Sequence, residues 1–379
     1  MPTSLAGGYV SADGHVVEPA DLWTTRIDKR FRDRAPHIET RKSIDFYVID
    51  GLDPVAVGLD GAALESKIAG KVESPVARHA DTRPGAWDPQ ERLKDQALDN
   101  LRAEMIYPGQ WSLMLYRIAD AEYQRAAVRV CNDWLSEFCA YAPDRLLGAA
   151  ILPMQGRLEW ATEEAERAAK IGLKAVMIPA VVPDRPYIHP DYEPFWAHLE
   201  ELGLPAVAHS GTAADIGAST HEKARRIGPG MAFMDEKAFQ PINAMTELIW
   251  SGAPQRYPKL KFIIAEGGIG WIACLLRLMD HWWEDHRHWM QPKLDEPPST
   301  YFKRQFWATF EDDRAGILTR ELIGVDRLMW GADYPLTEGT FPKSQQQIAK
   351  DFVGVPEDEV YQMVIGNAAK LFGLFGLQV

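Results

Sequence analysis

Short apolar runs alternate with helix-like patterns over most of this 379-residue chain, and this alternation limits its fold more than any other feature. Eight runs are typical of buried strands, and longer stretches between and after them repeat apolar residues at helical spacing. Strands that alternate with helices favour a parallel sheet, and eight such units predict a (β/α)8 barrel, an α/β fold. The strand runs lie at 8–13, 105–107, 146–152, 173–178, 204–208, 260–265, 306–310 and 327–332, and the helical patterns at 119–141, 157–171, 191–202, 235–251, 271–289, 312–323 and 344–373.

Residues 19–90 interrupt the alternation directly after the first strand. They are rich in Pro, Gly and charged residues, and they include a possible hairpin at 44–49 and 54–57. Long irregular segments of compact enzymes commonly form lids or substrate walls. We therefore expect one domain over residues 1–379, a TIM barrel in which the long insertion at 19–90 lies over the barrel mouth.

Composition excludes several classes of protein. A net charge of −13 without a basic cluster argues against nucleic-acid binding. The three cysteines have no CxxC spacing, the start of the chain has no secretory pattern, and no apolar run reaches the roughly 18 residues of a membrane span. We expect a cytoplasmic enzyme that binds a small-molecule substrate, does not associate with a membrane and forms a homodimer.

Four polar residues stand at or just beyond the predicted strand ends: Asp13, His15, His209 and Asp333. A single histidine after a strand is more often a structural residue than a ligand. Four such residues at the C-terminal ends of barrel strands, where barrel enzymes hold their active sites, favour a shared metal site. Imidazole and carboxylate ligands suit a divalent catalytic metal.

The first strand end supplies a ligand pair. Side chains alternate along a strand, so Asp13 and His15 point to the same face, which is the interior of a barrel. Glu18 lies beyond the strand end and is a further candidate, either as a metal ligand or as the partner of a ligand imidazole. Binding of the Glu18 carboxylate to local backbone is an equal alternative.

Two more residues extend the predicted site. Glu266 ends the sixth strand run and precedes a glycine-rich turn, so we expect its carboxylate in the mouth as a metal ligand or a base. His221 follows the fifth strand run and is the best candidate for a catalytic contact with substrate. With three carboxylates and two imidazoles, the expected cofactor is a divalent metal, Zn, Mn or Fe, as one ion with two as the alternative.

Together these motifs resemble the amidohydrolase-2 branch of the amidohydrolase superfamily, the group of aminocarboxymuconate-semialdehyde decarboxylase. The resemblance covers about residues 8–373. It implies a metal-dependent barrel that hydrolyses acyl bonds or decarboxylates aromatic and unsaturated acids, with Asp13, His15, His209 and Asp333 as metal ligands. The family's decarboxylases carry a histidine at the end of strand six, where this chain has Glu266. The motifs that carry the resemblance are Asp13-x-His15-x-x-Glu18-Pro19, His209-Ser210-Gly211, Glu266-Gly267-Gly268-Ile269-Gly270-Trp271 and Trp330-Gly331-Ala332-Asp333-Tyr334-Pro335.

This difference makes a metal-dependent hydrolase the leading interpretation. The substrate would be a small, partly apolar carboxylated or aromatic compound with an acyl or carbonyl bond. Asp333 would accept a proton from the attacking water and pass it to the leaving group, and Glu266 would bind metal or act as a second base. The alternatives are a non-oxidative metal-dependent decarboxylase, a carboxylate-rich diiron monooxygenase and, as the least favoured reading, a protein without catalytic activity.

Overall fold

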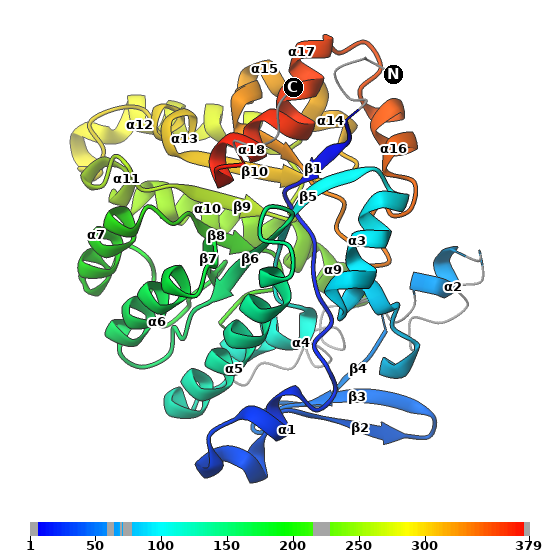
Figure 1. Cartoon of the computed structure of the whole chain (residues 1–379). Coiled ribbons are helices and arrows are strands. Elements are labelled where there is room, and N and C mark those ends of the chain that lie inside the picture. Colours follow the sequence, from blue (N-terminus) through cyan, green and yellow to red (C-terminus); the bar gives the residue numbers. More distant parts are fainter. Residues whose placement is uncertain (1–6, 59–63, 69, 71–77, 215–227, 375–379) are drawn as a thin grey trace.

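Eight parallel strands form a single sheet that curves into a barrel (Figure 1). The computed structural model describes residues 7–58, 64–68, 70, 78–214 and 228–374. Neighbours in the sheet follow chain order, as in a (β/α)8 barrel, so the predicted fold is confirmed. The strands are β1 (Tyr9–Ser11), β5 (Leu101–Ile106), β6 (Leu146–Ile151), β7 (Ala175–Pro179), β8 (Ala206–His209), β9 (Phe262–Ala265), β10 (Phe306–Phe310) and β11 (Leu328–Trp330).

Backbone hydrogen bonds close the barrel between β11 and β1. The amide of Ala12 donates to the carbonyl of Trp330 at 2.9 Å, and the amide of Asp333 donates to the carbonyl of Asp13 at 2.9 Å. The side chain of Ser11 adds a link, because its hydroxyl accepts a bond of 2.8 Å from the amide of Ala332. Closure therefore fixes the first and last predicted ligand segments side by side.

Helices cover the outside of the barrel, and the strands are buried on both faces. Every residue of β6 and β7 is buried, as expected of a parallel sheet packed between a filled interior and a helical layer. The principal outer helices are α3 (Pro89–Leu98), α5 (Ala121–Ala140), α6 (Leu158–Lys170), α7 (Glu193–Leu202), α10 (Gln240–Trp250), α12 (Ile272–Met290), α13 (Pro298–Gln305), α16 (Ser344–Asp351) and α18 (Asn367–Phe372).

Three predicted helices differ from the observed ones, and the one predicted at 312–323 is divided into α14 (Arg314–Leu318) and α15 (Arg320–Ile323). The stretch predicted as one helix at 344–373 ends first at Asp351, because Pro356 precedes a new helix, α17 (Glu357–Tyr361). The helix predicted from 235 begins earlier, with α9 (Pro229–Met234) and a π-helical turn at Asp235–Phe239 before α10. This turn places Lys237 at the site described below.

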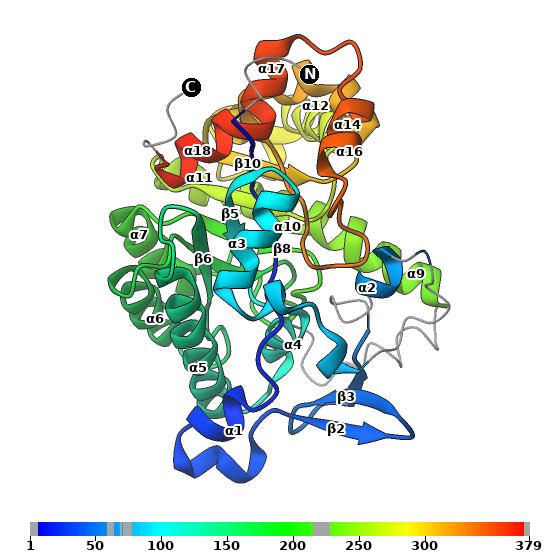
Figure 2. The ribbon, with the colours of Figure 1, turned by 45° about the vertical axis from the view of Figure 1, so that its right-hand side comes forward.

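The insertion after β1 forms a small antiparallel sheet of β2 (His37–Arg41), β3 (Ile44–Val48) and β4 (Val55–Ala56). The predicted hairpin corresponds to β3 and β4, whereas β2 was missed because its side chains are largely exposed and lack an apolar pattern. Figures 1 and 2 show this sheet apart from the barrel, on the side toward which the chain runs after β1. The expected role of residues 19–90 as a lid over the barrel mouth remains a prediction.

One contact ties the insertion to the barrel mouth. Lys67, in the short helix α2 (Leu64–Ile68), donates a 2.6 Å bond to the carbonyl of Gly339 in the segment after β11. In the part of the chain that the structure describes, no helix has the length and apolar character needed to span a membrane.

Candidate metal centre

Backbone carbonyls orient two buried imidazoles, His15 and His209, and fix which nitrogen carries the proton of the neutral ring. The Nδ1 atom of His15 lies 2.8 Å from the carbonyl oxygen of Pro108, and that of His209 lies 2.8 Å from the carbonyl oxygen of Ser210. A carbonyl oxygen only accepts hydrogen bonds, so each Nδ1 must be the protonated nitrogen. In the neutral ring each Nε2 then presents a lone pair, as a metal ligand does.

These lone pairs point at carboxylate oxygens. The Oδ1 atom of Asp13 lies 3.8 Å from Nε2 of His15 and 3.5 Å from Nε2 of His209, and Oδ1 of Asp333 lies 3.5 Å from Nε2 of His15. Among the described residues none of these atoms has a hydrogen-bond partner, and neither does Oδ2 of Asp333.

Acceptors that face one another in a buried space need a cation between them. Asp13 and His209 are 0% exposed and His15 is 1% exposed, so bulk solvent does not screen the charge of this site. The ligand atoms of Asp13, His15 and His209 lie within 4.8 Å of one another, and so do those of His15, Glu266 and Asp333. The residues present therefore fit a divalent metal ion.

Glu266 lies in the same space, at the end of β9. Its Oε2 atom is 3.3 Å from Nδ1 of His209 and accepts a short hydrogen bond from Ser210, while Oε1 accepts one from the ammonium of Lys237. The Lys237 ammonium also lies 2.6 Å from Oε1 of Glu338. The sequence analysis placed Glu266 at the mouth as a ligand, and its ligand role stays a prediction.

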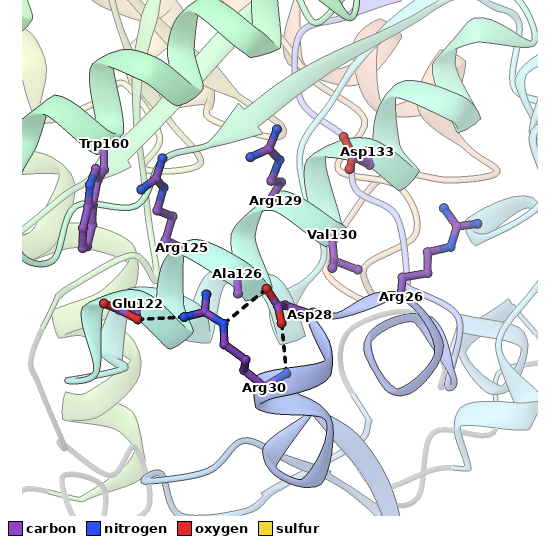
Figure 3. Close-up of a pocket in the computed structure, with 10 residues that line it drawn as sticks. All are labelled: Arg26, Asp28, Arg30, Glu122, Arg125, Ala126, Arg129, Val130, Asp133 and Trp160. Carbon is purple, nitrogen blue, oxygen red and sulfur yellow. Dashed lines mark hydrogen bonds and ion pairs between the residues drawn. The ribbon is translucent and has the colours of Figure 1, made fainter.

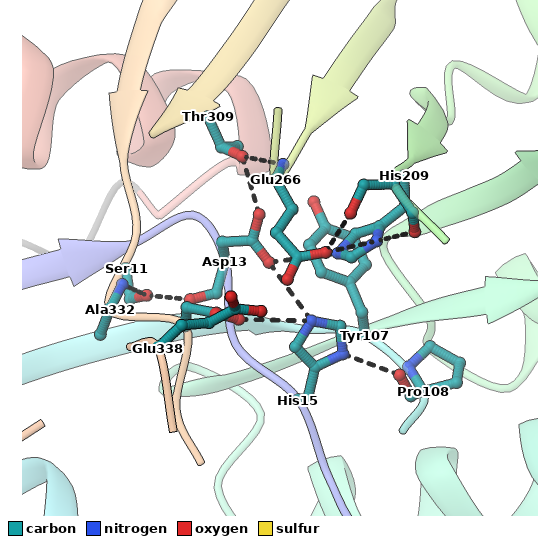
Figure 4. Close-up of polar contacts among 12 residues, drawn as sticks. Ser11, Asp13, His15, Tyr107, Pro108, His209, Glu266, Thr309, Ala332 and Glu338 are labelled. Atoms are coloured by element: carbon teal, nitrogen blue, oxygen red, sulfur yellow. Dashed lines mark hydrogen bonds and ion pairs between the residues drawn. The ribbon is translucent and has the colours of Figure 1, made fainter. Parts of the chain in front are cut away.

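A single hydroxyl connects two of these carboxylate residues. Thr309, in β10, donates a 2.7 Å bond to Oδ2 of Asp13 and accepts a 2.9 Å bond from the amide of Glu266 (Figure 4). This leaves Oδ1 of Asp13 free to face the two imidazoles. Thr309 was not predicted, although it stands at the end of the seventh predicted strand, where the same strand-end rule would have found it.

The backbone is strained where these carboxylates attach. Glu266 has a φ of 57° and Asp333 a φ of 52°, in the left-handed region that residues with a side chain rarely adopt. Such conformations cost of the order of 1–3 kcal/mol each and collect at functional sites. Here they turn both carboxylates into the barrel mouth.

The family model for amidohydrolases matches residues 15–374. The chain belongs to the amidohydrolase family. The resemblance identified from the motifs is therefore confirmed. The protein is an enzyme of the amidohydrolase superfamily, and it has a buried metal site of His, Asp and Glu residues.

Among its relatives, this amidohydrolase is 29% identical to a gamma-resorcylate decarboxylase of Rhodococcus jostii (strain RHA1) over 326 residues, 77% of this chain and 92% of the relative. Two solved structures share its fold. An amidohydrolase of Mycobacterium avium subsp. paratuberculosis K-10 superposes with a TM-score of 0.77 at 22% identity, over 97% of this chain and 100% of the other. A 5-carboxyvanillate decarboxylase of Novosphingobium aromaticivorans DSM 12444, complexed with manganese and 4-hydroxy-3-methoxy-5-nitrobenzoic acid, superposes with a TM-score of 0.67 at 16% identity, over 98% of each chain.

Buried polar residues outside the mouth hold the strand ends in place. The guanidinium of Arg92, in α3, donates a 2.9 Å bond to the carbonyl of His15 and forms an ion pair with Glu104 at 2.8 Å. It also lies 4.1 Å from the ring centroid of Tyr334, the residue after Asp333. Arg92 thus connects the ends of β1 and β11 from behind the site.

Charge and burial shift the pKa values of the site in opposite directions. Burial and the neighbouring imidazole of His209 lower the pKa of His15 to about 4. Burial also acts to lower the pKa of His209, but the carboxylates of Glu266 and Asp13 outweigh it and raise that pKa to about 9. Burial and the carboxylate of Glu266 raise the pKa of Asp333 well above its usual range. The shifts of His209 and Asp333 include the effect of a buried excess of negative charge, whereas burial beside a second imidazole explains the shift of His15.

Glu18, a predicted ligand, has partners outside the two groups of ligand atoms. The carboxylate of Glu18 accepts bonds from the amide of Gly109 at 2.8 Å and from the hydroxyl of Ser112 at 2.5 Å. It belongs to neither of the two groups of close ligand atoms, and these two partners lie in a distant segment rather than in the local backbone, so its role as a ligand stays a prediction. His221 lies outside the described residues.

The sequence analysis missed three charged residues at the mouth. Glu311 follows β10 directly, and its Oε1 atom is buried without a hydrogen-bond partner among the described residues. Lys237 and Glu338 reach the site from a helix and a loop, and no local sequence signal marks them. Glu311 directly follows a predicted strand, so a search for polar residues at the strand ends would have found it.

A separate pocket lies on the outer surface, between the insertion and α5 (Figure 3). Arginines line it, but Arg26, Arg30 and Arg125 pair with Glu137, Glu122 and Glu163. It includes none of the strand-end residues, so we assign it no part in the chemistry.

Proposed function

We propose that this amidohydrolase is a metal-dependent, non-oxidative decarboxylase of a small aromatic acid. Metal dependence is inferred from five buried atoms of Asp13, His15, His209 and Asp333 that have no hydrogen-bond partner among the described residues. The similarity to a gamma-resorcylate decarboxylase over most of both chains supports the reaction class. Related decarboxylases of the same fold bind manganese with aromatic ligands, which supports manganese as the metal.

In this reaction the bond between the ring carbon and the carboxylate breaks, carbon dioxide leaves, and the ring carbon takes up a proton. A divalent ion held by these residues would bind the substrate carboxylate and neutralise its charge. Asp333 is placed to move the proton, because both of its carboxylate oxygens lack partners and lie in the mouth. Lys237 keeps Glu266 paired, so that carboxylate is less available as a base.

The sequence favoured hydrolysis because Glu266 replaces the histidine of the family's decarboxylases. The described contacts weaken that argument. Both oxygens of Glu266 already accept hydrogen bonds, from Ser210 and Lys237, so neither oxygen is free to activate a water as Asp333 is. The relatives therefore support the decarboxylase alternative better than the hydrolase.

The test is decarboxylation by chelator-treated protein before and after reconstitution with Mn²⁺. Substrates are 2,6-dihydroxybenzoate and 5-carboxyvanillate, each labelled with ¹³C in the carboxylate, and the readout is labelled carbon dioxide. In D₂O the product should carry one deuterium at the vacated ring carbon.

We expect turnover only in the manganese-loaded protein. Release of labelled carbon dioxide without added metal, after complete chelation, would contradict the metal dependence. Hydrolysis of an aryl ester or lactone by manganese-loaded protein that decarboxylates neither acid would favour the hydrolase.

A further inference from the structure

Glu266 differs from the other carboxylates of the mouth because both of its oxygens already accept hydrogen bonds. Oε1 accepts one from the ammonium of Lys237, and Oε2 accepts one from the hydroxyl of Ser210. By contrast, Oδ1 of Asp13 and both oxygens of Asp333 have no such partner among the described residues. A buried carboxylate needs a cation. Lys237 supplies the cation for Glu266, so the oxygens of Asp13 and Asp333 are the ones that still need a metal ion.

Three contacts from separate segments fix the Glu266 carboxylate in one place. Lys237 approaches from the π-helical turn Asp235–Phe239, and Ser210 directly follows β8. The backbone amide of Glu266 donates a 2.9 Å bond to the hydroxyl of Thr309 in β10. Single π-helical turns are rare and occur frequently at functional sites. Here the turn brings an ammonium to a carboxylate that would otherwise be free to approach the ion.

The fixed carboxylate lies behind a ligand imidazole. Oε2 of Glu266 is 3.3 Å from Nδ1 of His209 (Figure 4), the nitrogen that also faces the carbonyl of Ser210 and carries the proton. The lone pair that can bind a metal is on Nε2, on the other side of the ring. A carboxylate on the protonated side of a ligating histidine fixes the ring and makes the ligand nitrogen more basic. Ser210 joins the two groups, since its carbonyl faces Nδ1 and its hydroxyl holds the carboxylate.

The second ligand imidazole has a different environment. Nδ1 of His15 lies 2.8 Å from the carbonyl of Pro108, as Nδ1 of His209 does from that of Ser210. The carboxylates paired with His15, those of Asp13 and Asp333, face its Nε2 atom instead. The two imidazoles therefore share a backbone partner on the protonated side and differ in the carboxylate behind the ring.

We propose that Glu266 is a positioning residue of the metal centre. Its carboxylate orients and polarises the imidazole of His209 from the Nδ1 side, and the bonds from Lys237 and Ser210 keep it from binding the ion. This role rests on the metal dependence of the proposed function and is independent of the reaction class. An oxygen of Glu266 also lies within 4.8 Å of the ligand atoms of His15 and Asp333, so direct ligation is the alternative that an experiment must separate.

The experiment uses the full chain, freed of metal by chelation, labelled with ¹⁵N at histidine and loaded with Zn²⁺, which is diamagnetic. Nuclear magnetic resonance then reports the Nδ1 protons of His209 and His15, assigned through dipolar contacts with Ser210 and Pro108. The His15 proton is an internal reference, because no carboxylate pairs with it on that side of the ring. Titration of Zn²⁺ gives the stoichiometry and the affinity.

Glu266→Gln changes the charge and keeps the shape. The new side chain offers one acceptor and one amide donor in place of two acceptors. Lys237 only donates, so it retains the acceptor, and the amide donor turns toward Ser210 and His209. The His209 Nδ1 proton should move upfield, because a neighbouring carboxylate no longer deshields it, and should move much further than the His15 proton. The variant should still bind one Zn²⁺ per chain, about 10–100-fold more weakly.

Glu338→Gln is the matched control. It removes the other carboxylate bound to Lys237, and both Nδ1 protons should keep their wild-type positions. An unchanged His209 proton in Glu266→Gln would overturn the positioning role. Equal shifts of both protons, or loss of the bound ion, would also overturn it and make Glu266 a direct ligand.

Ser210→Ala decides the matter if Glu266→Gln does not fold. This variant removes the hydroxyl that holds Oε2 of Glu266 and keeps the carbonyl that faces Nδ1 of His209. The carboxylate then loses its fixed place beside the ring, so the His209 proton should again move upfield while the His15 proton stays. A His209 proton at its wild-type position would contradict the proposal.

The positioning role and the proposed reaction fail separately. A protein in which only the His209 proton responds, but which decarboxylates neither acid with Mn²⁺, keeps the positioning role and refutes the reaction. A protein that decarboxylates an aromatic acid with Mn²⁺, while its His209 proton is the same in both variants as in the wild type, refutes the positioning role alone.

Discussion

Replacing Thr309 by valine tests whether the structure identifies the groups that orient the metal ligands. The hydroxyl of Thr309 donates to Asp13 and accepts from the amide of Glu266, and the residue is 0% exposed. Valine has nearly the same shape and cannot make either bond. The substitution therefore removes two polar contacts while leaving the packing of β10 almost unchanged.

The expected size follows from what each lost bond does. A hydrogen bond to a charged group contributes roughly 1.5–3 kcal/mol, and a buried amide left without a partner costs about 1–3 kcal/mol. Without Thr309, the Asp13 carboxylate is free to rotate its Oδ1 away from the two imidazoles. Loss of such a supporting contact typically lowers metal affinity about 10–100-fold, which is about 1.4–2.8 kcal/mol.

The assay is Mn²⁺ binding by titration calorimetry, with the free energy of unfolding of the metal-free protein from urea denaturation. Thr309→Val should bind Mn²⁺ about 10–100-fold more weakly and lose about 1–3 kcal/mol of stability. Thr309→Ser is the control, since it keeps the hydroxyl and removes one methyl group worth about 1 kcal/mol of burial.

Thr309→Ser should therefore retain wild-type affinity for Mn²⁺ despite a small loss of stability. Equal affinities in Thr309→Val and the wild type would refute the reasoning, because Asp13 would then not need the hydroxyl. Equal weakening in both variants would assign the effect to packing.

Three further substitutions separate the roles of other residues. His209→Ala should abolish both bound metal and turnover, and full activity would remove His209 from the site. Glu18→Gln should lower the free energy of unfolding in urea by about 1–3 kcal/mol, because it weakens the bonds to Gly109 and Ser112. The variant should still bind the metal, and loss of metal would instead support the role of Glu18 as a ligand. Burial raises the pKa of Asp99 to about 6, against the opposing bonds from Ser344. Because this folded pKa lies above the unfolded value of 3.8, the folded protein loses stability as Asp99 ionises. The free energy of unfolding should fall by up to about 3 kcal/mol as pH rises from about 4 to about 6. Urea titrations at each pH should show no such decrease in Asp99→Asn.

The barrel could be predicted from sequence because its strands are buried on both faces. Runs such as 146–152 and 260–265 are apolar without interruption, and helical patterns separate them. The elements that were missed lack this signal. The strand β2 is mostly exposed, and the break in the last predicted helix depends on Pro356 and the turn before it rather than on apolar spacing.

The site could be predicted only where chemistry and strand ends coincide. Asp13, His15, His209, Glu266 and Asp333 follow strand runs, and the structure places all five around one space. Lys237 comes from a π-helical turn after α9, so its approach to Glu266 depends on tertiary packing that no local pattern encodes. Glu18 was predicted from its position near the Asp13 and His15 motif, but its carboxylate accepts a bond from the backbone amide of Gly109 in another segment.

The site also links metal binding to the stability of the barrel. Two strained residues, Glu266 after β9 and Asp333 after β11, and several acceptors without partners among the described residues are buried around the barrel mouth, and each of these features opposes folding in the absence of a cation. A cation that binds only the folded chain recovers stability, by about 2.7 kcal/mol at a free concentration 100 times its dissociation constant. We therefore expect the residues that could hold a metal also to make the free energy of unfolding rise when the metal binds.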